Sequence, residues 1–406
     1  MHLFSIKEIG KAGVTALWFM FLTFPLLVIK VNTTENVVIW RWHNLLYVGA
    51  GSFCAYLLVS YFKRRRDQNN NASDEEVSEQ KPSSLVAFFS QAKVARPLYV
   101  VAALFFLAFP AFFSTYQVNI MITALMYVIL GLGLNIVVGV AGLLNLGYAA
   151  FYAVGAYSYA LLNHYFHLGF WLALPLGGLF AALFGIILGL PVLRLRGDYL
   201  AIVTLGFGEI IQLVLNNWTE FSNGASGISN IPRPGLFGFD LPVTAALNYQ
   251  YYLTIAMVIL TIFIINRLQN SRIGRALFAL REDEIACQAM GIDKTTIKLT
   301  AFALGATWAG LAGVLFAAKT TYVNPASFTF LESVIILCIV VLGGMGSIVG
   351  IIVGAFILIL MPEYLRAISE YRMLAFGAIL VIMMIFRPQG IVATARHTYK
   401  LSKQPE

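Results

Sequence analysis

A few polar side chains interrupt the long apolar runs of this 406-residue sequence, and they are the residues with the most scope for chemistry: Asn135, Asn145, Tyr148, Thr204, Glu209 and Glu332. Placing an ionisable group in lipid costs about 2.5–3.5 kcal/mol, so such a group normally faces a cavity or a partner. Glu209, which follows Gly208, is therefore the strongest candidate for a solute pathway. A structural hydrogen bond to a neighbouring helix explains the same residue at least as well.

The patterns that an enzyme needs are missing from the sequence. No glycine-rich turn is followed by Lys and Ser or Thr, so there is no Walker-type phosphate loop. The fragment Gly131-Leu132-Gly133 lies inside an apolar run, without the strand and acidic residue of a dinucleotide site. His164 and His167 could share a metal, but no third ligand lies nearby, and an interfacial loop is the better interpretation. We expect no catalytic, cofactor-binding or metal site.

Composition indicates which elements must position these residues. Hydrophobic residues make up 59% of the chain and charged residues 11%, whereas a soluble domain has about a quarter charged residues. Apolar blocks of about 20 residues recur, which is the length of a helix that crosses a bilayer. The net charge of +8 comes from basic residues at the ends of these blocks, a pattern typical of membrane orientation and not of nucleic-acid binding. The three cysteines have no redox or ligand spacing.

The sequence therefore predicts an all-α, polytopic transmembrane bundle with about 10–11 spans. Lys63 to Arg66 follow the second span and should stay in the cytoplasm, which places the N-terminus there too. The polar segment 67–81 is expected to be a disordered linker. The expected spans are 14–31, 44–62, 97–114, 118–139, 147–163, 169–192, 199–216, 250–266, 299–318, 331–360 and 372–387.

The segment 331–360 conflicts with this orientation, because one unbroken span there would carry the basic C-terminal tail to the outer face. We expect Gly343 to Ser347 to break it, so that it re-enters or splits into two short helices and the tail stays cytoplasmic. A second glycine-rich stretch, Gly139 to Gly147, interrupts an apolar run, so its backbone groups are expected to face the pathway.

Small residues also recur four apart within several spans, as in Gly305, Ala309 and Gly313 or in Ala181, Gly185 and Gly189. Such rows let helix backbones approach closely in lipid. Ordinary bundle packing is the more economical interpretation, and tight packing around a moving pathway is the alternative.

The cytoplasmic stretch 266–299 is the most informative soluble piece. A short helix is predicted over 275–290, with Leu277, Phe278, Ile285 and Ala289 available for packing and Arg281-Glu282-Asp283-Glu284 exposed. Gly291 suits a left-handed C-terminal cap, and Asp293 suits the N-cap of the next helix. The result is either a helix-turn-helix knob that a separate ATPase can move or a plain amphipathic connection on the lipid surface.

Longer motifs carry a family resemblance. The runs LGLNIVVGVAGLLNLGYAAFYAVGAY from Leu132, RLRGDYLAIVTLGFGEII from Arg194 and ALREDEIACQAMGIDKTTIKLTAF from Ala279 closely resemble LivM-type permeases of the high-affinity branched-chain amino acid ABC importer. VVLGGMGS from Val340 and FRPQGI from Phe386 match as well, so the likeness covers roughly 98–391. The resemblance divides the chain into a two-span region (1–66), a linker (67–96), a permease core (97–391) and a tail (392–406).

The resemblance implies a bacterial inner-membrane transport subunit without enzymatic activity or cofactor. Its implied partners are a second, LivH-like permease, two cytoplasmic ATPases, a periplasmic binding protein that delivers leucine, isoleucine or valine, and membrane lipid, with no nucleic acid. It implies that 267–298 is the ATPase-coupling loop, with Arg275, Arg281, Glu282, Asp283, Glu284, Gly291 and Asp293 as its residues. A permease for urea or amides and an ion-coupled secondary amino-acid transporter are the alternatives.

Overall fold

The computed structural model describes residues 13, 20, 29–32, 37–40, 49, 106–195, 197–235, 242–364, 377, 381 and 390–392. The chain divides into two compact units, Met1–Ala95 and Arg96–Glu406, and each is considered by itself. Most of the predicted spans 14–31, 44–62 and 372–387, and the whole linker at 67–96, lie outside the described residues.

The described part of the first unit is a small antiparallel hairpin. Strand β1 (Ile29–Asn32) pairs with β2 (Val37–Trp40), with Ile29 opposite Trp40. The prediction of a helical span through residue 31 is therefore wrong at its C-terminal end. The β-branched residues that dominate both strands, including Val31 and Val37, favour extended backbone, whereas the hydropathy of the segment alone does not distinguish strand from helix.

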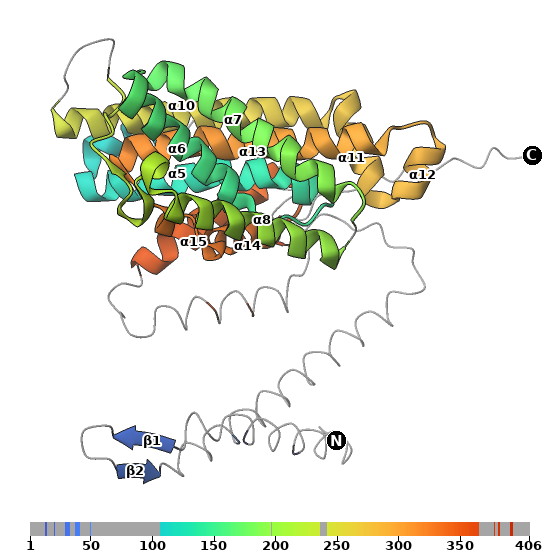
Figure 1. The fold of residues 1–406 in the computed structure, drawn as a ribbon, viewed down its shortest axis with the longest axis horizontal. Helices are drawn as coiled ribbons and strands as arrows, with labels where there is room; N and C mark the ends of the chain where they lie inside the picture. The colour runs from blue at the N-terminus through green and yellow to red at the C-terminus, as the bar shows by residue number, and fades with distance from the viewer. Residues whose placement is uncertain are drawn as a thin grey trace, which may run out of the picture. The chain divides into compact units, whose positions relative to one another are not determined.

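The second unit is a bundle of long apolar helices (Figure 1). They are α5 (Thr115–Asn135) with its π-helical extension η1 (Ile136–Val140), α6 (Tyr148–Phe166), α7 (Phe170–Val192), α8 (Asp198–Asn217), α10 (Val243–Gln269), α13 (Lys294–Thr320), α14 (Phe330–Gly343) and α15 (Ile348–Tyr364). Within the described ranges, six helices are long and apolar enough to cross a membrane. Helices α5 to α8, α10 and α13 coincide with the spans predicted between 118 and 318. Helices α10 and α13 extend several residues beyond the predicted ends.

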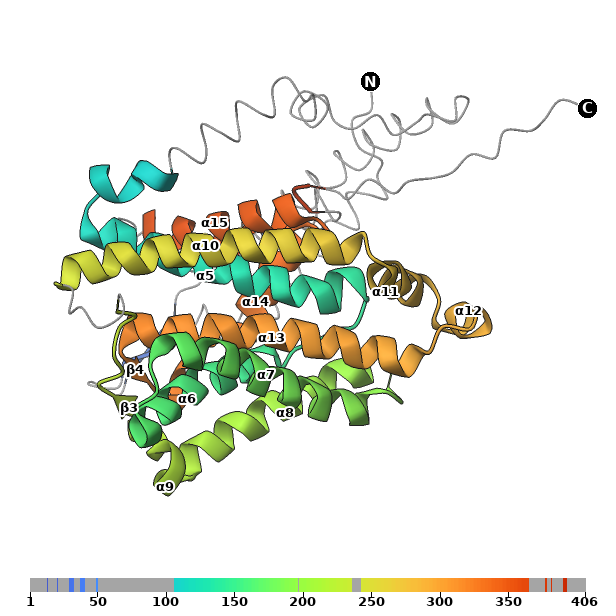
Figure 2. The ribbon, with the colours of Figure 1, turned by 90° about the horizontal axis from the view of Figure 1, so that it is seen from above.

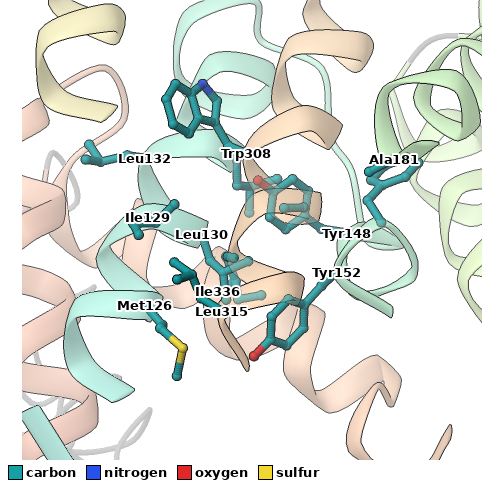
Figure 3. Packing of buried hydrophobic residues seen from close by; sticks show 14 of the residues in the cluster. Met126, Ile129, Leu130, Leu132, Tyr148, Tyr152, Ala181, Trp308, Leu315 and Ile336 are labelled. Carbon is teal, nitrogen blue, oxygen red and sulfur yellow. The ribbon is translucent and has the colours of Figure 1, made fainter. Parts of the chain in front are cut away.

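Helix α13 is the centre of the bundle. It packs against α5, α6 and α7, and Figure 2 shows α5 and α10 on one side of it with α6, α7 and α8 on the other. Buried side chains from four of these helices meet around it (Figure 3), namely Met126, Ile129 and Leu130 of α5, Tyr148 and Tyr152 of α6, Trp308 and Leu315 of α13, and Ile336 of α14. A displacement of α13 must therefore move its neighbours too, because packed interiors transmit strain.

Glycines allow the close approach of these helices. A methyl group at Gly155 of α6 would lie 2.5 Å from the Cα atom of Gly310 of α13, and one at Gly185 of α7 would lie 2.7 Å from the Cβ atom of Ala306. At Gly313 the added group would lie 2.6 Å from the backbone nitrogen of Ala156. The rows of small residues thus mark helix contacts, as the packing interpretation predicted.

The predicted break in the segment 331–360 is present. Helix α14 ends at Gly343, Gly344 and Gly346 have φ values of 109° and 89°, and α15 begins at Ile348. The break contacts the end of α5 at Asn135, whereas Glu363 at the end of α15 accepts a hydrogen bond from Tyr116 at the start of α5. The two halves therefore run in opposite directions, and the chain turns back at the break.

Candidate functional site

Four of the five pathway candidates lie inside the packed core. Asn135, Asn145, Tyr148 and Thr204 have no exposed surface. The Tyr148 hydroxyl donates to the carbonyl of Gly305 at 2.9 Å, which joins α6 to α13. These placements indicate that the side chains hold helices together, while their role in a pathway stays a prediction.

Asn145 and Thr204 shape the start of α6. The amide oxygen of Asn145 accepts from the Gly147 N–H at 3.0 Å, and the Thr204 hydroxyl accepts from the Leu146 N–H at 3.0 Å. The second bond ties the loop before α6 to α8. A buried N–H that loses its acceptor costs about 1–3 kcal/mol, so both side chains are needed for the non-helical backbone at 141–147.

Glu209 differs from the other four candidates because it is partly exposed. It lies on α8, whose outer face carries Ile202, Ile210 and Leu213 with 64%, 58% and 56% of their surface exposed. Within the part of the chain that the structure describes, Glu209 makes no hydrogen bond or ion pair. A structural bond to a neighbouring helix is therefore not observed among the described residues, and a role of Glu209 in a pathway stays a prediction.

The broken helix is held by two side chains from other helices. The Asn135 amide oxygen accepts from the Gly346 N–H at 2.8 Å, and the Gln269 side chain donates to the Gly346 carbonyl at 3.3 Å. The contribution of Gln269 was missed, because a glutamine at the polar end of a span resembles an ordinary flanking residue. A turn at this depth needs such partners, since lipid supplies none.

The segment 390–392 completes this turn. The N–H groups of Ile391 and Val392 donate to the carbonyls of Leu342 and Gly343 at 2.9 and 3.2 Å. These carbonyls belong to the last turn of α14, which has no helical partner for them. Residues 391 and 392 therefore lie at the end of the bundle where the break lies.

The predicted helical knob is present, but it contains two helices where one was expected. Helix α11 (Arg272–Glu282) and helix α12 (Glu284–Ala289) meet at Asp283, which has φ −156° and ψ 115°. The Asp283 carboxylate accepts from the N–H groups of Ile285 and Ala286 at 2.7 and 2.9 Å. An aspartate that caps a following helix ends the preceding one, and that local signal in the sequence was overlooked.

The predicted caps beyond α12 are confirmed. Gly291 has a φ of 81°, and Asp293 caps α13 by accepting from the Thr295 N–H at 3.0 Å and from the Thr296 hydroxyl at 2.5 Å. These bonds stabilise the charged carboxylate, the Thr296 hydroxyl most strongly, and so lower the pKa of Asp293. The knob, defined here as residues 271–293, is therefore joined to α13 by a short, well-capped turn.

The apolar residues of the knob form two groups, a buried group that packs against the bundle and an exposed group at the tip. Leu277 and Leu280 are buried and Phe278 packs against the core, as predicted for Leu277 and Phe278. The prediction that Ile285 and Ala289 pack is wrong, because both are exposed, Ile285 with 68% of its surface. Met290 beside them is 82% exposed. An apolar tip on a capped, compact element is a surface suited to a protein partner.

The charged residues of the knob also form an exposed group and a half-buried group. Glu282 and Asp283 are exposed as predicted, but Arg281 and Glu284 are half-buried. Glu284 forms an ion pair with Lys298 of α13 at 2.8 Å, and Lys294 approaches the same carboxylate oxygen at 3.8 Å. Lys298 is only 2% exposed, so this is a buried pair whose disruption would leave a charge without a counter-ion.

Arg281 joins the knob to the π-helical end of α5. Its guanidinium donates to the carbonyl of Gly139. Its side chain lies against Gly142, which has a φ of 72° and where an added methyl group would be 2.7 Å from the Arg281 Cγ atom. Arg275, by contrast, bonds locally to the carbonyl of Asn270 at 3.2 Å. Arg281 therefore links the knob to the end of α5, as Glu284 links it to α13.

The loop 141–144 and the knob enclose a cleft of about 330 Å³, lined by the aliphatic part of Arg281, by Glu284, by Lys298 and by Leu144 and Leu200. A second cavity, of about 400 Å³, lies at the other end of the bundle and is lined by His164, His167 and Glu220 among others. Over the described ranges, no three His, Cys, Asp or Glu side chains are close enough to hold a metal ion.

Comparison with known proteins agrees with this architecture. A family model described as "Branched-chain amino acid transport system / permease component" matches residues 116–386. The chain is 49% identical over 341 residues to the high-affinity branched-chain amino acid transport system permease protein LivM of Escherichia coli K12, covering 79% of this chain and 80% of that relative.

More distant relatives include a second kind of permease. The LivH permease protein of Salmonella typhimurium is 26% identical over 289 residues, covering 66% of this chain and 91% of the relative. A probable LivM permease of Methanocaldococcus jannaschii is 25% identical over 320 residues, covering 66% of this chain and 90% of the relative. No solved structure matches the chain. The family model and the relative at 49% identity are decisive: the chain belongs to the branched-chain amino acid transport system permeases.

Proposed function

We propose that this multi-pass membrane protein is the permease subunit of an ATP-driven importer for branched-chain amino acids. The 49% identity with a LivM permease over four fifths of both chains supports the substrate class. The knob supports the energy source, because a separate ATPase can do work only on a rigid element that it grips. Transport, and not a reaction on the solute, is the activity of the family.

The proposal includes a set of partners. A second permease of the LivH type completes the pathway, as the similarity between this chain and LivH proteins suggests. Two ATPases dock on the cytoplasmic side of the inner membrane, where both termini lie as well, and a periplasmic binding protein delivers the amino acid. The exposed apolar tip formed by Ile285 and Met290 is the surface assigned to one ATPase.

Two contacts carry motion from the docked knob into the bundle. The Glu284–Lys298 ion pair makes the knob move together with α13, the central helix. The bond from Arg281 to Gly139 reaches the π-helical end of α5, whose Asn135 holds the broken helix at Gly346. A π-helical turn is a weak point in a helix and is frequently found at functional sites. ATP-driven displacement of the knob would thus tilt α13 and shift the break together.

Co-purification from detergent tests this function. The tagged chain is expected to bring ATPase subunits with it in stoichiometric amounts, and the isolated complex should hydrolyse ATP faster when the amino-acid-loaded binding protein is added. The variant Ile285→Asp/Met290→Asp should lose the ATPases, because charges at the tip oppose burial in the interface. Tyr322→Asp, at an exposed aromatic residue on the other end of α13, is the matched control and should retain them. Purification without ATPases would reject the function.

A further inference from the structure

Two half-buried charged residues at the end of the bundle opposite the knob have no part in the coupling mechanism. Lys319 lies in the last turn of α13, and Glu332 lies in the first turn of α14. Each is only partly exposed within a helix that is long and apolar enough to cross a membrane. Ionised side chains at such positions are retained for a solute path or for a partner.

Both charges face the same side of α5. Lys319 donates from its ammonium to the Thr123 hydroxyl, and the Tyr127 hydroxyl donates to the Glu332 carboxylate at 2.5 Å. Thr123 and Tyr127 are four residues apart, so they are neighbours on one face of the helix. The cation and the anion are thereby held by hydroxyl groups of two residues that are one helical turn apart on α5.

These two charges do not neutralise each other. Within the part of the chain that the structure describes, neither Lys319 nor Glu332 forms an ion pair, whereas Glu284 and Lys298 at the other end pair at 2.8 Å. A hydroxyl partner satisfies one hydrogen bond but leaves the charge uncompensated. The site is complementary to a molecule that carries both a carboxylate and an ammonium group.

Aromatic rings that neighbour the two charges along the chain pack into an apolar cluster. Phe316 lies one turn before Lys319 on α13, and Phe328 precedes Glu332 by four residues. Their ring centroids are 5.7 Å apart, and Tyr152 of α6 contacts both, at 5.4 and 5.1 Å. Phe316 is only partly buried, so part of this apolar cluster is exposed. An aliphatic side chain would be desolvated against it.

We propose that Lys319, Glu332 and Phe316 form a binding site for a zwitterionic α-amino acid with an apolar side chain, at the end of the bundle remote from the ATPases. Lys319 receives the carboxylate, Glu332 receives the ammonium group, and Phe316 contacts the side chain. The inference rests on the proposed function for its substrate class. It adds a second binding site for the amino acid, within this chain and separate from the site on the binding protein.

The test uses the purified complex of this chain with the second permease and the ATPases, without the binding protein. Millimolar L-leucine is expected to raise its melting temperature by several degrees. L-Leucinol, which lacks the carboxylate, and 2-hydroxy-4-methylpentanoate, which lacks the ammonium group, should have no effect. An equal shift with either analogue, or no shift with leucine, would overturn the site.

Two variants separate recognition from folding. Glu332→Gln still accepts the Tyr127 hydroxyl bond and Lys319→Gln still donates to Thr123, so the fold should persist while the leucine shift disappears and uptake falls at least tenfold. Glu220→Gln, at an exposed carboxylate on the same end of the bundle, is the control and should retain both. A normal leucine shift in both site variants would reject the assignment.

The outcomes for the wild-type complex distinguish the two proposals. An intact complex that hydrolyses ATP but shows no leucine shift would reject this binding site alone. Loss of the ATPases from the wild-type complex would reject the proposed importer function.

Discussion

The knob and the centre of the bundle use polar side chains in opposite ways. In the knob, Asp283 caps the short helix α12 and Asp293 caps the start of α13, both from exposed positions, and the apolar residues Ile285 and Met290 are exposed at the tip. In the bundle centre, Asn135 and Tyr148 are fully buried and bridge helices that are far apart in sequence. The comparison shows that the knob is organised mainly by local contacts and exposes an apolar surface to a partner. The centre of the bundle is organised by contacts between residues far apart in sequence and exposes no such surface.

If the centre depends on close backbone approach, an added side chain there should have the largest effect. Gly155→Leu is expected to destabilise the protein by about 3 kcal/mol or more, because the new atoms would overlap the backbone of Gly310. The monodisperse fraction after detergent extraction measures this loss. Gly206→Leu in α8 is the control, since nothing lies within 4 Å of the added group. Equal yields from both variants would show that the helices are not tightly packed at Gly155.

The buried ion pair departs from this comparison, because it is a buried polar contact that anchors the knob to α13. Glu284→Lys is expected to abolish uptake while the protein still inserts, because it places three positive charges together with Lys294 and Lys298. Glu282→Lys, at an exposed neighbour, should transport normally. Uptake of labelled leucine by cells expressing equal amounts of each variant decides between the two outcomes, and normal uptake by Glu284→Lys would remove the coupling assignment.

Arg281 should affect coupling more than assembly. Arg281→Gln is expected to keep the ATPases bound but to lower uptake five- to tenfold per ATP hydrolysed, because the bond to the Gly139 carbonyl is weakened. Arg275→Gln loses only a local bond to Asn270 and serves as the comparison. ATP hydrolysis and uptake are measured together in proteoliposomes. An unchanged ratio for Arg281→Gln would show that the knob transmits motion through α13 alone.

Removal of one bridge in the centre should have a smaller effect. Asn135→Ala leaves the Gly346 N–H without its acceptor at a buried position, which costs about 1–3 kcal/mol. The melting temperature of the purified protein is expected to fall by a few degrees. Gln269→Ala, which removes a longer bond to the same residue, should cost less. If Gln269→Ala proved the more damaging change, the assignment of the principal support to Asn135 would be wrong.

The smallest expected effect concerns a cap of the knob and depends on pH. The Thr296 and Thr295 bonds lower the folded-state pKa of Asp293 below its unfolded value of about 3.9. Its contribution to stability is therefore fully present above about pH 4 and is lost as the pH falls through the folded pKa. Hydrogen exchange at Thr295 and Thr296 should accelerate, beyond the intrinsic change, only in that acidic window. Asp293→Asn should abolish that dependence, and a pH-independent wild type would contradict the cap.

The sequence by itself determined the elements whose signals are local. The apolar blocks predicted the spans, Gly343 to Ser347 predicted the break, and Gly291 with Asp293 predicted the turn into α13, because caps and breaks depend on residues a few positions apart. The division of the knob at Asp283 was of the same local kind and was missed only because one continuous helix was assumed.

Only the tertiary structure decided which side chains meet. The contacts of Arg281 with Gly139, Glu284 with Lys298 and Asn135 with Gly346 depend on how each helix is rotated and how far it slides along its neighbour. The sequence also did not indicate that Lys319 contacts Thr123 and that Glu332 contacts Tyr127, which is one turn further along α5. In a bundle where almost every face is apolar, hydropathy does not fix helix rotation, and only the packing of the whole set of helices does.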